Sequence, residues 1–218
     1  LRAAGIEVGV GVRAPQAEEQ NAAYLHHRRT GRPLVILKLG QTLDGRIATA
    51  AGASRWITGE TARRHAHRWR SWVDVVAVGA GTVLADDPAL TVRHVRGRDP
   101  RPLVIDGRLR CDPRAQVFGG REPILATAAS TAPAERQVYA DRGAEVWALE
   151  DTDGRIDLGQ LWTRAGDAGL TSVILEGGRT LVAAALRDRA VDRVMLYIAP
   201  RVLGGDAMAS VGALELQS

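Results

Sequence analysis

Short apolar runs rich in β-branched residues recur along the chain and alternate with segments of helical periodicity. Strands that are apolar on both faces and separated by helices predict an α/β fold, with a mainly parallel central sheet and helices on both faces. Seven strands are expected, at residues 34–39, 73–78, 102–105, 123–126, 145–149, 172–175 and 193–198. The expected helices lie between them, at residues 58–72, 133–142, 157–167 and 180–189.

The helix expected at residues 58–72 has two different faces. Thr58 is the expected N-cap, and one face of the helix is apolar. The opposite face carries three basic residues, Arg63, His67 and Arg70.

The first 31 residues differ from the rest. Residues 4–12 alternate apolar side chains with glycine and predict one short strand, and a polar helix should follow and end near Thr30-Gly31. Such a piece cannot form a core alone. We therefore expect residues 1–31 to be the tail of a preceding domain plus a linker, and residues 32–218 to form the main domain.

Composition is that of an ordinary globular domain, with 45% apolar and 25% charged residues in 218. No apolar run approaches the ~20 residues of a membrane span and no signal segment opens the chain, so a cytoplasmic protein is expected. The single cysteine, Cys111, excludes an internal disulfide and a multi-cysteine zinc site, and no metal is expected.

Charge points to a small anionic ligand rather than to nucleic acid. The net charge is +4, but the arginines are scattered and no basic run is interleaved with stacking aromatic residues. All 29 basic residues except Lys38 are arginine. A lone lysine indicates that its compact ammonium is needed at that position, although chance retention of one lysine is the alternative.

Two strand ends carry groups suited to binding a ligand. The strand at residues 73–78 leads into small residues, then adjacent carboxylates at Asp86 and Asp87 and a cation at Arg93, which is typical of a ligand site at a strand end. The strand at residues 172–175 is followed by Glu176, two glycines and a helix start, whose free amides favour phosphate. A tight strand-to-helix turn is the alternative, but a carboxylate there is costly unless it meets a ligand.

A third segment, at residues 38–46, runs from Lys38 through Gly40 into a turn, and residues 54–58 follow. Trp56 offers a rigid face to a ligand, or it packs in the core. Ser54 either solvates the loop or joins Arg70 and Arg93 in binding phosphate.

Together the motifs KLGQTLDGR, SRWITG, GAGTVLADDPALTVR, ILEGGRTL and YIAPRVLGG resemble the reductase domain of the bacterial bifunctional riboflavin-biosynthesis deaminase/reductase. The resemblance covers residues 32–206, and residues 1–31 resemble the end of the family's deaminase domain. The deaminase's zinc signature is absent from this sequence, so no deaminase activity is expected. The sequence given stops at Ser218, short of where the family's last strands would pair, so incomplete C-terminal strands are expected.

The resemblance implies a dihydrofolate-reductase-like fold, a homodimer and NADPH as cofactor. It also implies a reaction, the reduction of 5-amino-6-(5-phosphoribosylamino)uracil to 5-amino-6-(5-phosphoribitylamino)uracil. In that reaction the nicotinamide delivers a hydride to C1 of the opened sugar.

The resemblance also implies site residues. The substrate phosphate would bind Ser54, Arg70, Arg93 and the backbone amide of Leu90, with Glu176 on the opened sugar and Lys38 delivering or orienting a proton. The cofactor would bind Gly40, Trp56, Thr82, Asp86, Gly107, Gly178, Arg179, Thr180, Leu181, Val182, Ala183 and Ala184.

Gly107 follows Asp106 where a serine or threonine would be more helpful, so its expected contact is through the backbone. Because Arg108 and Arg110 follow this turn, NADPH should be preferred over NADH. Which arginine binds the 2′-phosphate stays open.

Three alternatives remain. The substrate of a related reductase is the undeaminated 2,5-diamino-6-ribosylamino-pyrimidinone 5′-phosphate. A dihydrofolate-reductase-like pterin reductase would have no use for three phosphate-binding side chains. A non-catalytic binding protein would not need Lys38 and Glu176, and both are present.

Overall fold

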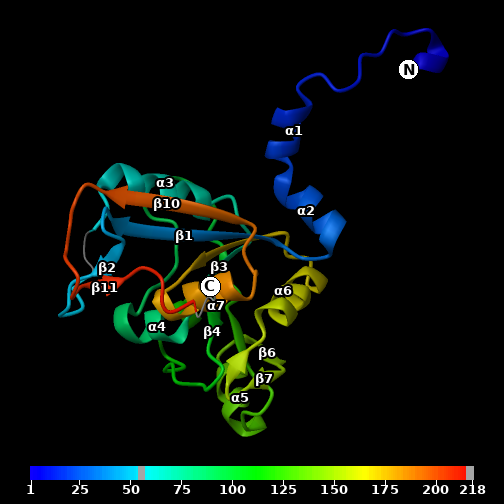
Figure 1. The fold of residues 1–218 in the computed structure, drawn as a ribbon. Helices are drawn as coiled ribbons and strands as arrows, with labels where there is room; N and C mark the ends of the chain where they lie inside the picture. The colour runs from blue at the N-terminus through cyan, green and yellow to red at the C-terminus, as the bar shows by residue number, and fades with distance from the viewer. Residues whose placement is uncertain (54–56, 215–218) are drawn as a thin grey trace.

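Seven parallel strands form the centre of the computed structural model, which describes residues 1–53 and 57–214 (Figure 1). The strands are β1 (Leu34–Thr42), β3 (Val75–Gly79), β4 (Arg101–Ile105), β5 (Ile124–Ala128), β6 (Glu145–Leu149), β9 (Ser172–Glu176) and β10 (Arg193–Ala199). Their order in the sheet is β10-β1-β9-β3-β4-β5-β6, and every neighbouring pair runs parallel. All seven predicted strands are confirmed.

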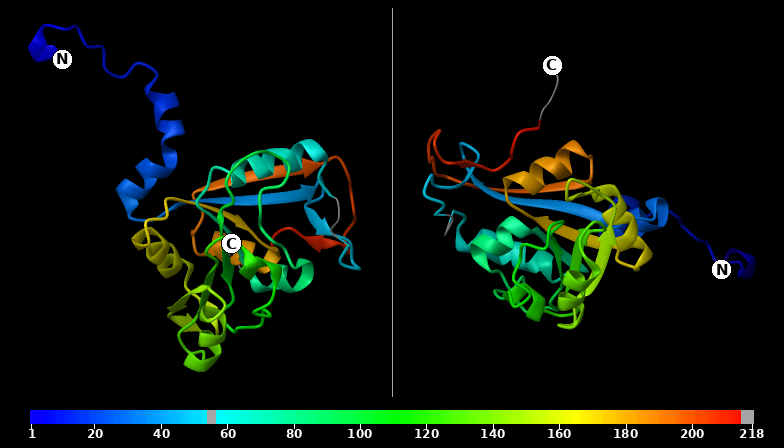
Figure 2. Two further views of the ribbon diagram at one scale, coloured as in Figure 1. Left: turned by 180° about the vertical axis from the view of Figure 1, so that it is seen from behind. Right: turned by 90° about the horizontal axis from the view of Figure 1, so that it is seen from below.

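Helices cover both faces of this sheet, as predicted (Figure 2). They are α3 (Glu60–Arg70), α4 (Ala80–Asp86), α5 (Pro133–Ala140), α6 (Leu158–Asp167) and α7 (Arg179–Arg187). Helices α6 and α7 pack on one face and α4 and α5 on the other, to which α3 adds Trp69. Because successive strand side chains point to opposite faces, Leu37 joins the first core while Ile36 joins the second.

Two small antiparallel pairs and a short helix complete this body. Strand β2 (Arg46–Ala48) pairs with β11 (Met208–Ala209), and β7 (Asp151–Thr152) pairs with β8 (Arg155–Ile156) as a hairpin. A 3-10 helix, η2 (Gln116–Gly119), lies between β4 and β5 in the chain.

The predicted strand at residues 4–12 is wrong. A 3-10 helix, η1 (Arg2–Ala4), is followed by irregular chain that points away from the sheet in both figures, so no partner strand is within reach. Gly5 and Gly11 also have positive φ angles of 75° and 87°, which interrupt an extended run. Helices α1 (Ala14–Gln20) and α2 (Ala22–Thr30) follow, and the second ends at Gly31 as predicted.

Two other expectations need correction. The N-cap of α3 is Gly59 rather than Thr58, because the helix begins at Glu60. The small residues after β3, which were not among the expected helices, form helix α4, since Ala80 and Val83 lie one turn apart and are both buried against the sheet.

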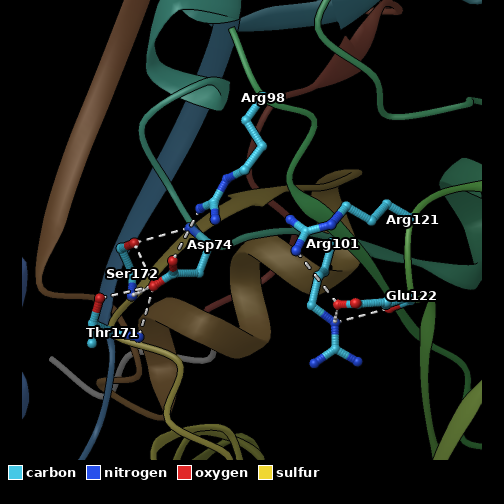
Figure 3. A network of polar contacts seen from close by, with 7 residues as sticks. All are labelled: Asp74, Arg98, Arg101, Arg121, Glu122, Thr171 and Ser172. Atoms are coloured by element: carbon cyan, nitrogen blue, oxygen red, sulfur yellow. Dashed lines mark hydrogen bonds and ion pairs between the residues drawn. The ribbon is translucent and has the colours of Figure 1, made fainter.

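A polar network ties together the amino ends of β3 and β9 (Figure 3). One carboxylate oxygen of Asp74 accepts hydrogen bonds from both the amide and the hydroxyl of Thr171, and likewise of Ser172, at 2.8–3.2 Å. Arg98 lies 3.4 Å from the other oxygen. Burial alone would raise the pKa of Asp74, but these hydrogen bonds hold it below its usual value. The two central strands are therefore fixed in register at the end where the chain enters them.

The opposite edge of the sheet is where a ligand site is expected. The chain passes from β1 to β3 and outward to β6, then returns to place β9 between β1 and β3 and β10 beyond β1. The strand order thus reverses around β9. Parallel sheets bind ligands at the carboxyl ends of the strands beside such a reversal.

Candidate active site

Glu176 stands at the carboxyl end of β9 in a cluster of charges. Arg70, from the last turn of α3, donates two hydrogen bonds to its carboxylate, from Nε to Oε1 at 2.7 Å and from Nη2 to Oε2 at 2.9 Å. Lys38 is the β1 neighbour of Glu176 across the sheet, and its Nζ lies 3.6 Å from Oε2. Three predicted site residues are thus brought together by two adjacent strands and one helix.

This cluster is largely withdrawn from water, with 14% of the Glu176 side chain and 12% of the Arg70 side chain exposed. Burial alone would raise the pKa of the Glu176 carboxyl, but the charges of Arg70 and Lys38 outweigh it and hold that pKa well below the usual range. Burial opposes the charge of Arg70, and the Glu176 carboxylate restores it and raises the Arg70 pKa. At neutral pH the cluster therefore holds one anion between two cations.

Arg70 also reaches the segment of residues 90–93, which carries two predicted phosphate contacts. Its Nη1 donates to the Thr91 carbonyl at 3.1 Å, so all three guanidinium nitrogens have acceptors. Leu90 is buried with φ of 54°, in the left-handed region that leucine rarely adopts. Arg93 is exposed. A phosphate near Arg93 would therefore meet an exposed cation, whereas Arg70 is held by three acceptors.

The first turns of α4 and α7 lie side by side next to this cluster. Both helices follow a glycine N-cap, Gly79 and Gly178, at the end of adjacent strands. A Cβ atom added to Gly178 would lie 3.9 Å from the Thr82 hydroxyl. Leu181 covers Gly79 and Gly177, whose added Cβ atoms would lie 3.3 and 3.1 Å from its Cδ2. Of these glycines only Gly178 has no side chain packed against it, so the backbone can approach a ligand closely there.

The remaining residues of α7 that were predicted to bind cofactor differ in exposure. Val182 and Ala183 are buried, and Val182 packs in the core. Arg179 and Thr180, in the first turn, are exposed. The first turn is therefore the part of α7 that is open to a ligand.

Gly107, after β4, is pressed against the tip of the β7–β8 hairpin. A Cβ atom there would overlap the Gly154 carbonyl oxygen, and one on Gly154 would lie 2.7 Å from the Arg108 side chain. Asp106 is buried, and its carboxylate accepts the Cys111 N–H at 2.8 Å, which closes the turn. Gly107 is thus required by packing, which explains why no serine or threonine stands there.

A polar cavity of about 700 Å³ lies beside this contact. Its walls come from the β4 turn, the segment after β5 and the hairpin. The lining residues are Gly107, Arg108, Ser130, Thr131, Thr152, Asp153, Gly154 and Arg155. Two arginines, two hydroxyl-bearing residues after β5 and several backbone amides make it suitable for an anionic group.

The positions of the other predicted residues say less about where a ligand would bind. Gly40 lies near the end of β1, where an added Cβ would be 3.2 Å from the Thr58 side chain. Asp86 is exposed in the last turn of α4, away from the helix start. Ser54 and Trp56 lie outside the described residues.

The sequence indicates no site role for two residues that shape this site. His67 of α3 accepts the Arg93 N–H at Nδ1, at 3.1 Å, and Asp99 accepts the Val92 N–H at 2.7 Å. The i, i+3 spacing of His67 and Arg70 was the available signal, because it puts both on one helix face.

Neither a metal centre nor a membrane span is found among residues 1–53 and 57–214. No group of three or more His, Cys, Asp or Glu residues is arranged there to hold an ion. The helices of that part are too short or too polar to cross a bilayer. The site brings a buried carboxylate, an ammonium group and two guanidinium groups to the carboxyl edge of the sheet. The carboxylate suits sugar hydroxyls and the cations suit a phosphate, so the site suits a phosphorylated sugar.

Comparison with known proteins shows the family of this chain. The sequence profile of the RibD C-terminal domain matches residues 33–218. The chain is 36% identical over 220 residues to the riboflavin biosynthesis protein RibD of Escherichia coli (strain K12), covering 95% of this chain and 59% of that protein. The chain thus spans well under two thirds of that relative's length.

Solved structures give the same relationship. Acinetobacter baumannii RibD superposes with a TM-score of 0.84 at 31% identity, over all of this chain and 60% of that one. A Thermotoga maritima deaminase and 5-amino-6-(5-phosphoribosylamino)uracil reductase gives 0.81 at 28% identity, also over all of this chain and 60% of that one. The predicted dihydrofolate-reductase-like fold is confirmed by these neighbours.

Proposed function

Since this chain belongs to the RibD C-terminal domain family, the reductase domain of riboflavin biosynthesis proteins, we propose that it reduces 5-amino-6-(5-phosphoribosylamino)uracil to 5-amino-6-(5-phosphoribitylamino)uracil with NADPH. The observation that supports this most is the Lys38–Glu176–Arg70 cluster at the carboxyl ends of β1 and β9. It joins a carboxylate for sugar hydroxyls to an ammonium group that can supply a proton.

Each residue of the site has its own proposed role. A carboxylate has about four lone-pair sites, so Glu176 can bind both Arg70 and a hydroxyl of the opened sugar. Lys38, held 3.6 Å from Glu176, is the candidate to place a proton on the sugar nitrogen or ring oxygen. Arg93 and the amide of Leu90 are assigned to the phosphate, together with Ser54 and Arg70. Bound NADPH supplies the hydride for C1.

The chain's own residues fit that cofactor. The first turn of α7 leaves backbone open at Gly178, two residues after Glu176, and Thr82, Gly178 and Thr180 are assigned to the cofactor there. The cavity beside Gly107 is assigned to the adenosine end. Arg108 lines this cavity, whereas Arg110 lies 3.8 Å from Asp106, which supports Arg108 as the candidate to bind the 2′-phosphate.

This assignment predicts the cofactor preference. Arg108→Ala should raise the KM for NADPH by ~10 to 100-fold, the value of a lost charge-assisted hydrogen bond, and leave the KM for NADH nearly unchanged. Arg110→Ala is the matched control and should change neither. The measurement is initial-rate kinetics with both cofactors.

An equal rise of both KM values in Arg108→Ala would mean that the variant disturbs the hairpin, where Arg108 donates to the Asp153 carbonyl at 2.6 Å. Comparable efficiency of NADH and NADPH in the unaltered protein would contradict the assignment of the cavity. The proposed reaction itself is tested by NADPH oxidation that depends on the pyrimidine substrate.

A further inference from the structure

We propose that His67 is a positioning residue, which holds the backbone of residues 91–93 in the shape that presents Leu90 and Arg93 to the substrate phosphate. The inference rests on the proposed function for the identity of the ligand. It adds a residue to which the sequence motifs assign no role.

Backbone groups of three consecutive residues in this segment are held by three different side chains. Arg70 donates to the Thr91 carbonyl at 3.1 Å, Asp99 accepts the Val92 N–H at 2.7 Å, and His67 accepts the Arg93 N–H at 3.1 Å. Leu90, just before them, has the unusual φ of 54° and is buried. A loop in this conformation persists only when its surroundings fix it from several sides.

His67 lies on the same face of α3 as Arg70, which belongs to the charged cluster. His67 and Arg70 are three residues apart on α3, so both point from the same side of the helix toward the strand ends. Arg70 holds Glu176 as well as Thr91, which makes α3 the element that sets the distance between the sugar-binding carboxylate and the phosphate-binding segment. A rigid spacing of this kind suits a substrate whose phosphate and reacting carbon are joined by a sugar chain.

The hydrogen bond defines the state of the imidazole. Because Nδ1 accepts the Arg93 N–H, it carries no proton, and the neutral ring has its proton on Nε2. Only 6% of His67 is exposed, and the ring of His94 packs edge-on against it at 4.7 Å between centroids.

The groups that face this ring keep it neutral. Burial, together with the nearby Arg70, His94 and Arg93, lowers the pKa of His67 to about 4, although Glu176 opposes the shift. His67 therefore serves as a hydrogen-bond acceptor at neutral pH and is not the proton donor of the reaction.

Two variants separate this role from simple core packing. In His67→Asn a side-chain oxygen can replace Nδ1 as acceptor, whereas His67→Leu keeps much of the volume and has no acceptor. His65→Leu is the matched control, because His65 is on the same helix and its Nδ1 pairs with the Tyr197 hydroxyl instead.

The first readout is kinetic. His67→Leu should raise the KM for the phosphorylated substrate ~3 to 30-fold, as expected for one lost hydrogen bond and a loosened loop, with kcat changed less than KM. His67→Asn should recover most of that loss, and His65→Leu should show none. Equal KM values for the Leu and Asn variants, or an unchanged KM in both, would overturn the proposal.

The second readout does not depend on activity. Amide hydrogen exchange at Arg93 should be faster in His67→Leu than in the unaltered protein and close to normal in His67→Asn, and binding of ribose 5-phosphate should weaken in the same order. If the unaltered chain does not reduce the pyrimidine, the proposed function fails by itself, and these two measurements still decide the role of His67. If His67→Leu does not fold, the Asn variant must keep a protected Arg93 amide, and rapid exchange there would overturn the proposal.

Discussion

Glu176 illustrates how single residues of this site serve two purposes. Its carboxylate balances Arg70 and Lys38 in a largely buried setting, so the folded protein needs that charge before any ligand binds. Removing one partner of a buried ion pair is costly, because the other charges remain without compensation.

We therefore predict that Glu176→Gln lowers both activity and stability. The value of kcat/KM should fall ~10 to 1,000-fold, and the free energy of unfolding should fall by ~1–3 kcal/mol, since the amide keeps the shape but not the charge. Glu60→Gln is the control, because Glu60 pairs with Arg64 on the exposed surface and its loss should cost less than ~0.5 kcal/mol. Normal kcat/KM with a lower melting temperature would remove Glu176 from the active site.

His67 gives a prediction about acid stability. Its pKa is about 4 in the folded protein, below the ordinary 6.5, so the unfolded chain binds the proton more readily. Its contribution to stability is thus complete above pH 6.5 and is lost as the pH falls toward 4.

Denaturant unfolding at several pH values should show a loss of up to ~3 kcal/mol across this window, reduced in His67→Asn. Asp74 and Glu176, whose pKa values are lowered, lose their own contributions only below their unfolded pKa values of 3.8 and 4.5. An identical pH dependence in the variant would show that His67 is accessible to protons in the native state.

At the scale of secondary-structure elements, the sheet separates a structural edge from a functional one. The Asp74 network joins β3 and β9 at their amino ends, and the charged cluster lies at the carboxyl end of the same β9 strand. Stability and activity should therefore respond separately to changes at the two edges.

Asp74→Asn tests that separation. The amide oxygen can keep only part of the four hydrogen bonds made by one Asp74 oxygen, so unfolding should become easier by ~1–3 kcal/mol, while kcat/KM stays within about twofold. Asp141→Asn, at an exposed position, is the control and should change neither. A large loss of kcat/KM at a temperature where the variant is still folded would mean that the two edges of the sheet are coupled.

The sequence predicts the strands well because apolar residues continue along each run. That pattern needs no knowledge of the partners, and it identifies the edge strands β6 and β10, where burial alternates, as well as the buried strands between them. Helix α4 was missed because Ala, Gly and Thr give a weak apolar period, and the β7–β8 hairpin because its strands have two residues each. Residues 4–12 have the right alternation for a strand but no neighbour to pair with.

At the scale of the whole molecule, the sequence locates the site but not its internal pairing. Strand ends rich in glycine and carboxylates indicate the correct edge of the sheet. The Arg70–Glu176 hydrogen bonds join residues 106 positions apart and depend on how α3 crosses the sheet, which no local pattern encodes. The same holds for His67, whose partner is a backbone amide 26 residues away.

The division of the chain into a tail at residues 1–31 and a main domain stays a prediction, as does the homodimer. The tail contacts the main body through a bidentate Glu19–Arg193 pair and through His27, which lies 3.2 Å from the Gly166 carbonyl. Strand β10, at the edge of the sheet, exposes Val194 and Leu196.

The most direct test of the account is oxidation of NADPH by the purified chain, followed at the near-ultraviolet absorbance of the reduced cofactor. The deaminated substrate 5-amino-6-(5-phosphoribosylamino)uracil and the undeaminated 2,5-diamino-6-ribosylamino-pyrimidinone 5′-phosphate are compared, with Glu176→Gln as the control of reduced activity. We predict NADPH consumption that needs the deaminated substrate and yields the ribityl product. Consumption only with the undeaminated substrate would correct the substrate, and no consumption with either by the folded chain would contradict the proposed function.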